Sequence, residues 1–172
     1  MFIYCLFCET EKCDAIARSA EAFFACRAIS PKQVQHTWVK GQPVDRQHDL
    51  LPGYVFLYFE EEKPEIAAFR RMNGVIRCLS DTEKRYELAG DDEAFALALL
   101  KKDGVIGRTQ VYQEGDRIRI AEGAFEGLES RILKVDRRHT RMQIEIPFNR
   151  QMIKTWVEYE IVEPVRKTEE IL

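Results

Sequence analysis

The stretch that most constrains the fold is residues 53–59, G-Y-V-F-L-Y-F, in which every residue after the glycine is aromatic or aliphatic. Side chains alternate along a strand, so Tyr54, Phe56 and Tyr58 share one face and the residues between them share the other. A strand that is apolar on both faces lies at the centre of a covered sheet, or it has one face that awaits a partner. The pattern leaves both alternatives open.

Shorter patterns around this strand predict an α+β chain. Apolar runs predict strands and apolar residues at helical spacing predict helices. Before residue 103 we expect strands over 2–8, 34–39 and 75–79, a helix capped by Thr10 that stops before Ser30-Pro31, and helices over 64–72 and from Asp91 or Asp92 to Leu100. After residue 115 we expect only strands, over 117–121, 131–136, 142–146, 153–157 and 159–162.

The change from mixed helices and strands to strands alone predicts two domains. Glycines at 104, 107 and 115 interrupt polar sequence, which is typical of a linker. Strands about ten residues apart with tight turns are typical of a small β-barrel. We therefore predict an α/β domain over 1–103, a linker over 104–114, a β-barrel over 115–163 and a flexible tail over 164–172.

Composition narrows the class of protein. The chain is 45% hydrophobic and 32% charged, as is usual for a globular protein, and its net charge is −3. No apolar run approaches the roughly 20 residues that span a bilayer. No basic segment precedes the acidic Glu9 and Glu11, so a signal peptide is not expected. We expect a cytoplasmic protein with no membrane partner and with reduced thiols.

Cys5 and Cys8 form a C-x-x-C, which raises the alternatives of a thiol oxidoreductase or a metal site. A redox pair usually lies at a helix N-terminus, and zinc needs a second pair of ligands at similar spacing. In a strand these two side chains point to opposite faces, whereas Cys13 could lie near Cys8. The histidines at 36, 48 and 139 have no ligand spacing. We expect no catalytic residue, no metal, no cofactor and no enzymatic activity.

Two motifs carry a family resemblance. Residues 50–57 are L-L-P-G-Y-V-F-L, and residues 115–132 are G-D-R-I-R-I-A-E-G-A-F-E-G-L-E-S-R-I, close to the KOW signature. An aromatic first strand, the P-G-Y-V-F strand, a linker and a C-terminal KOW motif, in this order, resemble the NusG family of transcription elongation factors. The resemblance spans residues 2 to about 163. It implies a NusG-type sandwich of an antiparallel sheet with helices, followed by a KOW β-barrel.

The resemblance also implies binding surfaces. In NusG-like proteins an apolar patch of the N-terminal domain docks onto the clamp helices of the largest RNA polymerase subunit, without bond-making chemistry. The matching positions are Ile3, Tyr4, Leu51, Tyr54 and Phe56. The KOW domain of the housekeeping factor presents a Phe-Gly-Arg loop to ribosomal protein S-ten or the termination factor Rho, and Phe148, Asn149 and Arg150 occupy that place.

Departures from the family pattern favour a specialised paralogue. Ile3 replaces a common tryptophan, Ala124 a proline, Ser130 a glycine and Asn149 the glycine of the presenting loop. Val135-Asp136-Arg137-Arg138 is similar to a basic turn of the LoaP branch, whose KOW domain binds an RNA hairpin. The candidate RNA-binding residues are Arg131, Lys134, Arg137, Arg138, His139, Arg141, Arg150 and Lys154. The alternative is a solvated turn whose charges serve solubility.

The leading hypothesis is a monomeric, non-enzymatic antitermination factor that binds the polymerase clamp and nascent RNA. Two alternatives remain: a housekeeping factor whose KOW domain contacts Rho or ribosomal protein S-ten, and a ribosome-associated KOW protein. The resemblance also allows contact with non-template DNA through the first helix, where Arg18 and Arg27 are the only arginines.

Overall fold

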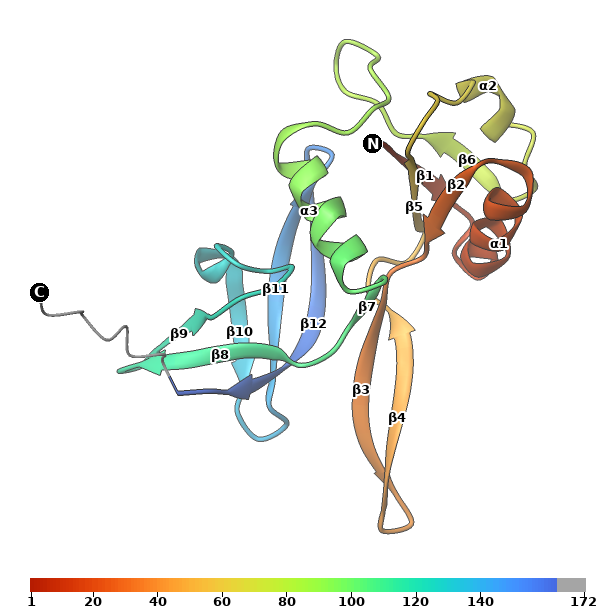
Figure 1. Cartoon of the computed structure of the whole chain (residues 1–172). Helices are drawn as coiled ribbons and strands as arrows, with labels where there is room; N and C mark the ends of the chain where they lie inside the picture. The colour runs from red at the N-terminus through yellow and green to blue at the C-terminus, as the bar shows by residue number, and fades with distance from the viewer. Residues whose placement is uncertain (164–172) are drawn as a thin grey trace, which may run out of the picture.

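The computed structural model describes residues 1–163, and the predicted flexible tail, 164–172, lies outside the described residues. The N-terminal half is built on a four-stranded antiparallel sheet in the order β2-β5-β1-β6 (Figure 1). Its strands are β1 (Phe2–Cys8), β2 (Cys26–Ile29), β5 (Tyr54–Phe59) and β6 (Val75–Cys78). The aromatic strand, β5, is central in this sheet, which is one of the two alternatives that its apolar faces left open. β2 was not predicted. Among the described residues no helix is long and apolar enough to cross a membrane.

Helices cover this sheet on both sides. Helices α1 (Cys13–Phe23) and α2 (Ile66–Phe69) pack on one face and α3 (Gly90–Lys101) on the other. The predicted caps were wrong. Residues Thr10–Lys12 form a 3₁₀ turn and α1 begins after it, without a side-chain cap. Helix α3 begins at Gly90, so Asp91 and Asp92 lie in its first turn, where their charge favours the helix dipole.

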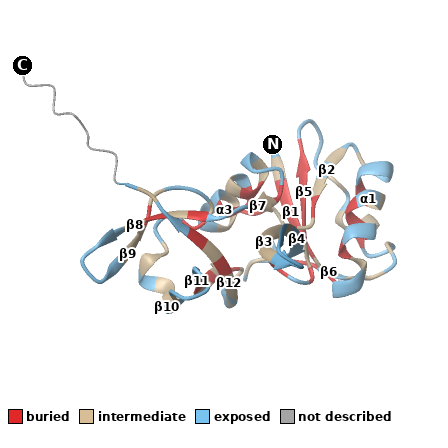
Figure 2. Ribbon diagram, turned by 90° about the horizontal axis from the view of Figure 1, so that it is seen from below, coloured by how far each residue is buried: buried red, intermediate tan, exposed pale blue. Residues whose placement is uncertain are grey.

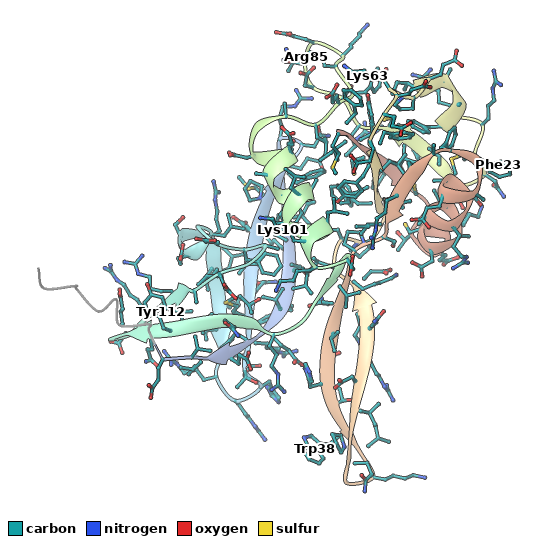
Figure 3. The ribbon with its side chains drawn as sticks, viewed as in Figure 1. Phe23, Trp38, Lys63, Arg85, Lys101 and Tyr112 are labelled. Atoms are coloured by element: carbon teal, nitrogen blue, oxygen red, sulfur yellow. The ribbon has the colours of Figure 1, made fainter. Side chains whose placement is uncertain are left out.

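A long hairpin extends away from the sheet. Its strands β3 (Lys32–Val39) and β4 (Gln42–Asp49) form a separate three-stranded sheet with β7 (Val105–Ile106), which runs parallel to β3. Trp38 lies near the tip and is 75% exposed (Figure 3). The predicted extent of the linker, 104–114, needs correction, because this segment contains β7 and also β8 (Thr109–Glu114).

Strand β8 belongs to the C-terminal sheet, whose order is β10-β11-β12-β8-β9. The other strands are β9 (Arg117–Ile120), β10 (Ile132–Asp136), β11 (Arg141–Phe148) and β12 (Gln151–Ile161), and a 3₁₀ turn over Glu129–Arg131 precedes β10. Strand β12 is continuous where two strands were predicted, and β9 and β10 are the edges. Phe125 of the glycine-rich loop is buried beneath this sheet beside Met142 and Ile144.

The N-terminal sheet separates two clusters of buried side chains. In Figure 2 the buried positions of its central strands β1 and β5 are coloured red. Cys5 lies in the cluster that faces α3 and the C-terminal sheet, whereas Cys8 and Cys13 lie in the cluster beneath α1 and α2. The prediction that the C-x-x-C cysteines point to opposite faces is thus confirmed. Gly53, at φ +91°, precedes β5, and a Cβ there would lie 3.1 Å from the Phe7 ring, so the tight entry into the strand requires glycine.

Candidate functional site

One face of the N-terminal sheet gathers most of the predicted polymerase-binding residues. In the antiparallel register Ile3 lies opposite Tyr58, Cys5 opposite Phe56 and Phe7 opposite Tyr54, so the six share a face. We call this the aromatic face: Ile3, Cys5, Phe7, Tyr54, Phe56 and Tyr58. Leu51, in the preceding loop, is buried in the same cluster as Phe56.

Tyr4 does not belong to this surface. It lies on the opposite side of the sheet, beneath α1 and α2, with its ring centroid 5.8 Å from that of Phe59 and 6.4 Å from that of Phe69. Burial is the main cause of its raised pKa. The prediction that Ile3 and Tyr4 act together on one surface was wrong because neighbours in a strand point to opposite faces.

The aromatic face is covered by the turn between β11 and β12. Phe148 places its ring centroid 5.3 Å from that of Phe56, 5.9 Å from Tyr54 and 6.1 Å from Phe95 of α3. Phe148 and Phe56 are both buried, while Tyr54 remains half-buried at the rim. The C-terminal sheet therefore places one aromatic side chain into the face that the sequence predicted to dock a partner.

Two polar contacts accompany this packing on the side of α3. The Tyr58 hydroxyl donates to the backbone oxygen of Ala96 at 2.7 Å, which ties α3 to β5. The backbone N–H of Asn149 donates to both carboxylate oxygens of Asp92, at 3.2 and 3.1 Å. Burial raises the pKa of Asp92, and the Asn149 N–H opposes this shift. The turn after Phe148 is thus held by α3.

Another polar contact, away from α3, joins the C-terminal sheet to the β3–β4 hairpin. Glu158 of β12 accepts from the His36 backbone N–H at 3.0 Å, and its other oxygen lies 2.7 Å from His36 Nδ1. Arg108 Nε lies 3.6 Å from the same carboxylate, and Asp45 lies 3.7 Å from His36 Nε2. This contact could not be predicted from the sequence, because it joins residues 122 positions apart.

The predicted partner loop is placed differently from the expectation. Asn149 and Arg150 both have positive φ, 47° and 62°, which makes the tight turn that joins β11 to β12. Arg150 is exposed, but Phe148 points into the protein rather than toward solvent. In this arrangement the aromatic side chain of the loop is unavailable to a partner.

The basic residues of the C-terminal sheet lie around one turn. Asp136 accepts from the His139 backbone N–H at 3.2 Å and from Arg141 Nε at 3.1 Å, which orders the turn over 137–140. His139 Nδ1 lies 2.8 Å from the same carboxylate, and the His139 hydrogen bonds are the main cause of the lowered pKa of Asp136.

The predicted RNA-binding arginines and lysines differ in whether a nearby carboxylate neutralises them. Within residues 1–163 no carboxylate lies within ion-pair distance of Arg131, Lys134, Arg137, Arg138 or Arg150. Lys154 lies 3.7 Å from Glu145. Most of the unneutralised positive charge of the predicted RNA-binding residues therefore lies on β10 and the turns on either side of it. Arg150 lies beyond the other end of β11.

The thiols are set in apolar surroundings. Burial raises the pKa of Cys8 and of Cys78 to about 12, and it raises the pKa of Cys5 well above the ordinary value of a thiol. Among the described residues no group of three or more Cys, His, Asp or Glu side chains is arranged to hold a metal ion. A thiol with a raised pKa carries little thiolate at neutral pH, so it is a poor nucleophile.

A groove of about 600 Å³ lies on the far side of the sheet, between α1 and the segment after α2. Phe23, which is 81% exposed, forms one wall, and Lys12 and Arg71 lie at its margin. Of the two arginines considered for DNA contact, Arg27 pairs with Asp103 at 2.8 Å and neither lines this groove. The groove was not predicted from the sequence, because the helical spacing of Phe23 grouped it with the apolar residues of its helix.

Comparison with known proteins supports the fold. No family model matches the sequence, and no curated protein matches it. A solved structure of NusG from Thermotoga maritima, which concerns domain interaction in that protein, aligns with a TM-score of 0.53 at 13% sequence identity. The alignment covers 91% of this chain and 93% of that one. At this identity the comparison establishes a mixed α/β fold like that of NusG.

Proposed function

We propose that the chain is a non-enzymatic transcription elongation factor that docks onto the clamp helices of RNA polymerase through its aromatic face. The observation that carries this proposal is the covering of that face by a side chain from the other half of the chain. Phe148 reaches this face from a separate sheet, so the face would be exposed if that sheet moved away. A face that serves a partner needs such a cover in the free protein, because large exposed apolar patches promote aggregation.

The same contact also covers the turn at 148–150. If the C-terminal sheet is a KOW domain that presents this turn to Rho or ribosomal protein S-ten, Phe148 becomes accessible only when the turn leaves the aromatic face. Docking of the clamp and presentation of the turn are then coupled, because both follow from a single opening. The arrangement is consistent with either a specialised or a housekeeping factor.

The proposal includes nascent RNA as the second ligand, held by the unneutralised cations of the C-terminal sheet. Arg137 and Arg138 are exposed on an ordered turn, so binding phosphate costs little further ordering of the backbone. Together with clamp docking this would hold the factor on the elongating polymerase and promote readthrough of terminators. Such a factor acts in the cytoplasm.

The groove beside Phe23 supports a second contact, with non-template DNA. Its exposed aromatic ring and the margin formed by Lys12 and Arg71 suit a base and its phosphate. We therefore propose Phe23, Lys12 and Arg71 as the contacts to non-template DNA, in place of Arg18 and Arg27.

The test is readthrough of an intrinsic terminator in a purified transcription reaction. Tyr54→Ala removes a half-buried ring from the rim of the aromatic face, whereas Tyr112→Ala removes a half-buried ring from β8, outside it. We expect Tyr54→Ala to lose readthrough and Tyr112→Ala to keep it. Equal activity of a folded Tyr54→Ala variant and the wild type would show that this face does not dock the polymerase.

A further inference from the structure

The outer face of the C-terminal sheet carries an aromatic and polar row, of which the proposed function uses only the charge of Lys134. Buried and half-buried residues alternate along β11, so Met142 and Ile144 face the core while Arg141 and Gln143 face outward. In the register Gln143 lies opposite both Lys134 of β10 and Trp156 of β12. A cation, an amide and an indole therefore lie side by side across three strands, at cross-strand distances of about 5 Å.

Arg141 lies over one end of this row. Its guanidinium carbon is 4.8 Å from the centre of the Trp156 ring, and its Nε donates to Asp136 at 3.1 Å. The Arg141 side chain still keeps 42% of its surface exposed. A planar guanidinium that rests on an indole and is held at its edge by a carboxylate has lost most of its rotamer freedom before any ligand arrives.

We propose that this platform, made of Arg141, Trp156, Gln143 and Lys134, binds an unpaired base of single-stranded RNA. The base stacks on the Arg141–Trp156 pair, the Gln143 amide hydrogen-bonds its edge, and Lys134 with the turn arginines contacts the flanking phosphates. This inference rests on the proposed function and deepens it, because it states that the RNA ligand is recognised through an unstacked base and not only through its charge.

The chemistry of the face favours RNA over an acidic peptide. Phosphates and carboxylates could both neutralise Lys134, Arg137 and Arg138. A stacked guanidinium and indole, however, offer flat π surface, which matches a nucleobase. An amide beside that surface can donate and accept at once, as a base edge requires.

The experiment uses the full chain and a 12-nucleotide single-stranded uridine RNA, with binding measured by fluorescence anisotropy over a range of salt concentrations. Arg141→Lys keeps the charge and removes the flat group. Its matched control is Arg119→Lys on β9, since Arg119 Nε donates to Glu114 at 3.0 Å and the side chain is 43% exposed. Arg119 lies opposite Tyr112 in the register, but among the described residues its guanidinium makes no cation–π contact. We expect Arg141→Lys to weaken binding about 5- to 20-fold with little change in salt slope, and Arg119→Lys to bind as the wild type does.

A second readout is intrinsic fluorescence. The chain has two tryptophans, so Trp38→Phe leaves Trp156 as the only one, and we expect its emission to change when the RNA is added. Equal affinity of Arg141→Lys and wild type, unchanged Trp156 emission, or equally tight binding of duplex RNA would overturn the platform while leaving a charge-based RNA site standing. Tighter binding of a poly-glutamate peptide than of the RNA would also overturn it. Absence of any RNA binding by the wild type would overturn the RNA part of the proposed function as well.

Discussion

Phe148, in the last position of β11, packs its ring 5.3 Å from the ring of Phe56 in the centre of the N-terminal sheet. The two residues are 92 positions apart, and each lies in a motif that the sequence had assigned to a different binding surface. Each proposed surface therefore serves as the cover of the other. The predictions below test this contact, the faces of the sheet and the charged turn.

Phe56 and Tyr54 should differ in their importance for stability. Phe56 is fully buried, and its replacement by alanine should lower the free energy of unfolding by about 3–5 kcal/mol. Tyr54→Ala should cost clearly less, because that ring is half-buried at the rim. Urea denaturation measures both values. A loss below about 1 kcal/mol for Phe56→Ala would contradict its place in the core.

The cysteines should resist thiol reagents. Burial raises the pKa of Cys8 and Cys78 to about 12, and Cys26 is only half-buried with a pKa raised to about 11. We expect Ellman's reagent at pH 7.5 to modify the native protein slowly, with Cys26 first, and to modify all five thiols rapidly in denaturant. Rapid labelling of Cys5 or Cys8 in the native state, or a stoichiometric zinc site there, would show that the first strand is assigned wrongly.

Asp92 should make stability depend on pH in the mildly acidic range. Its pKa is raised by burial, so the folded form binds a proton more readily than the unfolded form does. The resulting stabilisation is complete below the ordinary aspartate pKa and is lost as pH rises through the raised value. Asp92→Asn should remove this dependence. Thermal unfolding of both proteins from pH 3 to pH 7 is the measurement, and parallel profiles would refute the prediction.

The basic turn should govern the electrostatic part of RNA binding. Replacing Arg137 and Arg138 by glutamate should weaken binding and lower the slope of log affinity against log salt by about 1.4, which corresponds to two lost phosphate contacts on a single strand. The control replaces Lys101 and Lys102, two adjacent exposed lysines at the end of α3, by glutamate, which changes the net charge by the same amount. Unchanged affinity and slope in the Arg137 and Arg138 variant would indicate that the turn is merely solvated.

Residues with a strong local pattern could be predicted from the sequence. The two faces of β5, the first strand and the opposite orientations of Cys5 and Cys8 all follow from the alternation of side chains in a strand. Prediction failed where distant contacts decide the outcome. Val105 and Ile106 form a strand because β3 lies beside them, and Phe148 is buried because Phe56 and Phe95 lie across from it.

The candidate surfaces also differ in how far they could be predicted from the sequence. Alternation along the strands accounts for the side chains that make up the aromatic face, whereas the family resemblance grouped Tyr4 with Ile3 although Tyr4 lies on the opposite side of the sheet. The platform at Arg141 and Trp156 could not be predicted. These two residues are 15 positions apart, and only the register of β11 and β12 brings them together.

The covering of the aromatic face is tested most directly by the affinity of the full chain for RNA polymerase. Phe148→Asp removes the covering ring, and His36→Ala removes the imidazole contact to Glu158, while the backbone N–H of residue 36 keeps its hydrogen bond to that carboxylate. Both variants should open the aromatic face and bind polymerase more tightly than the wild type, by about tenfold for Phe148→Asp, while Tyr54→Ala should bind more weakly. If folded Phe148→Asp and His36→Ala variants bind polymerase no better than the wild type, the aromatic face is not a covered docking surface.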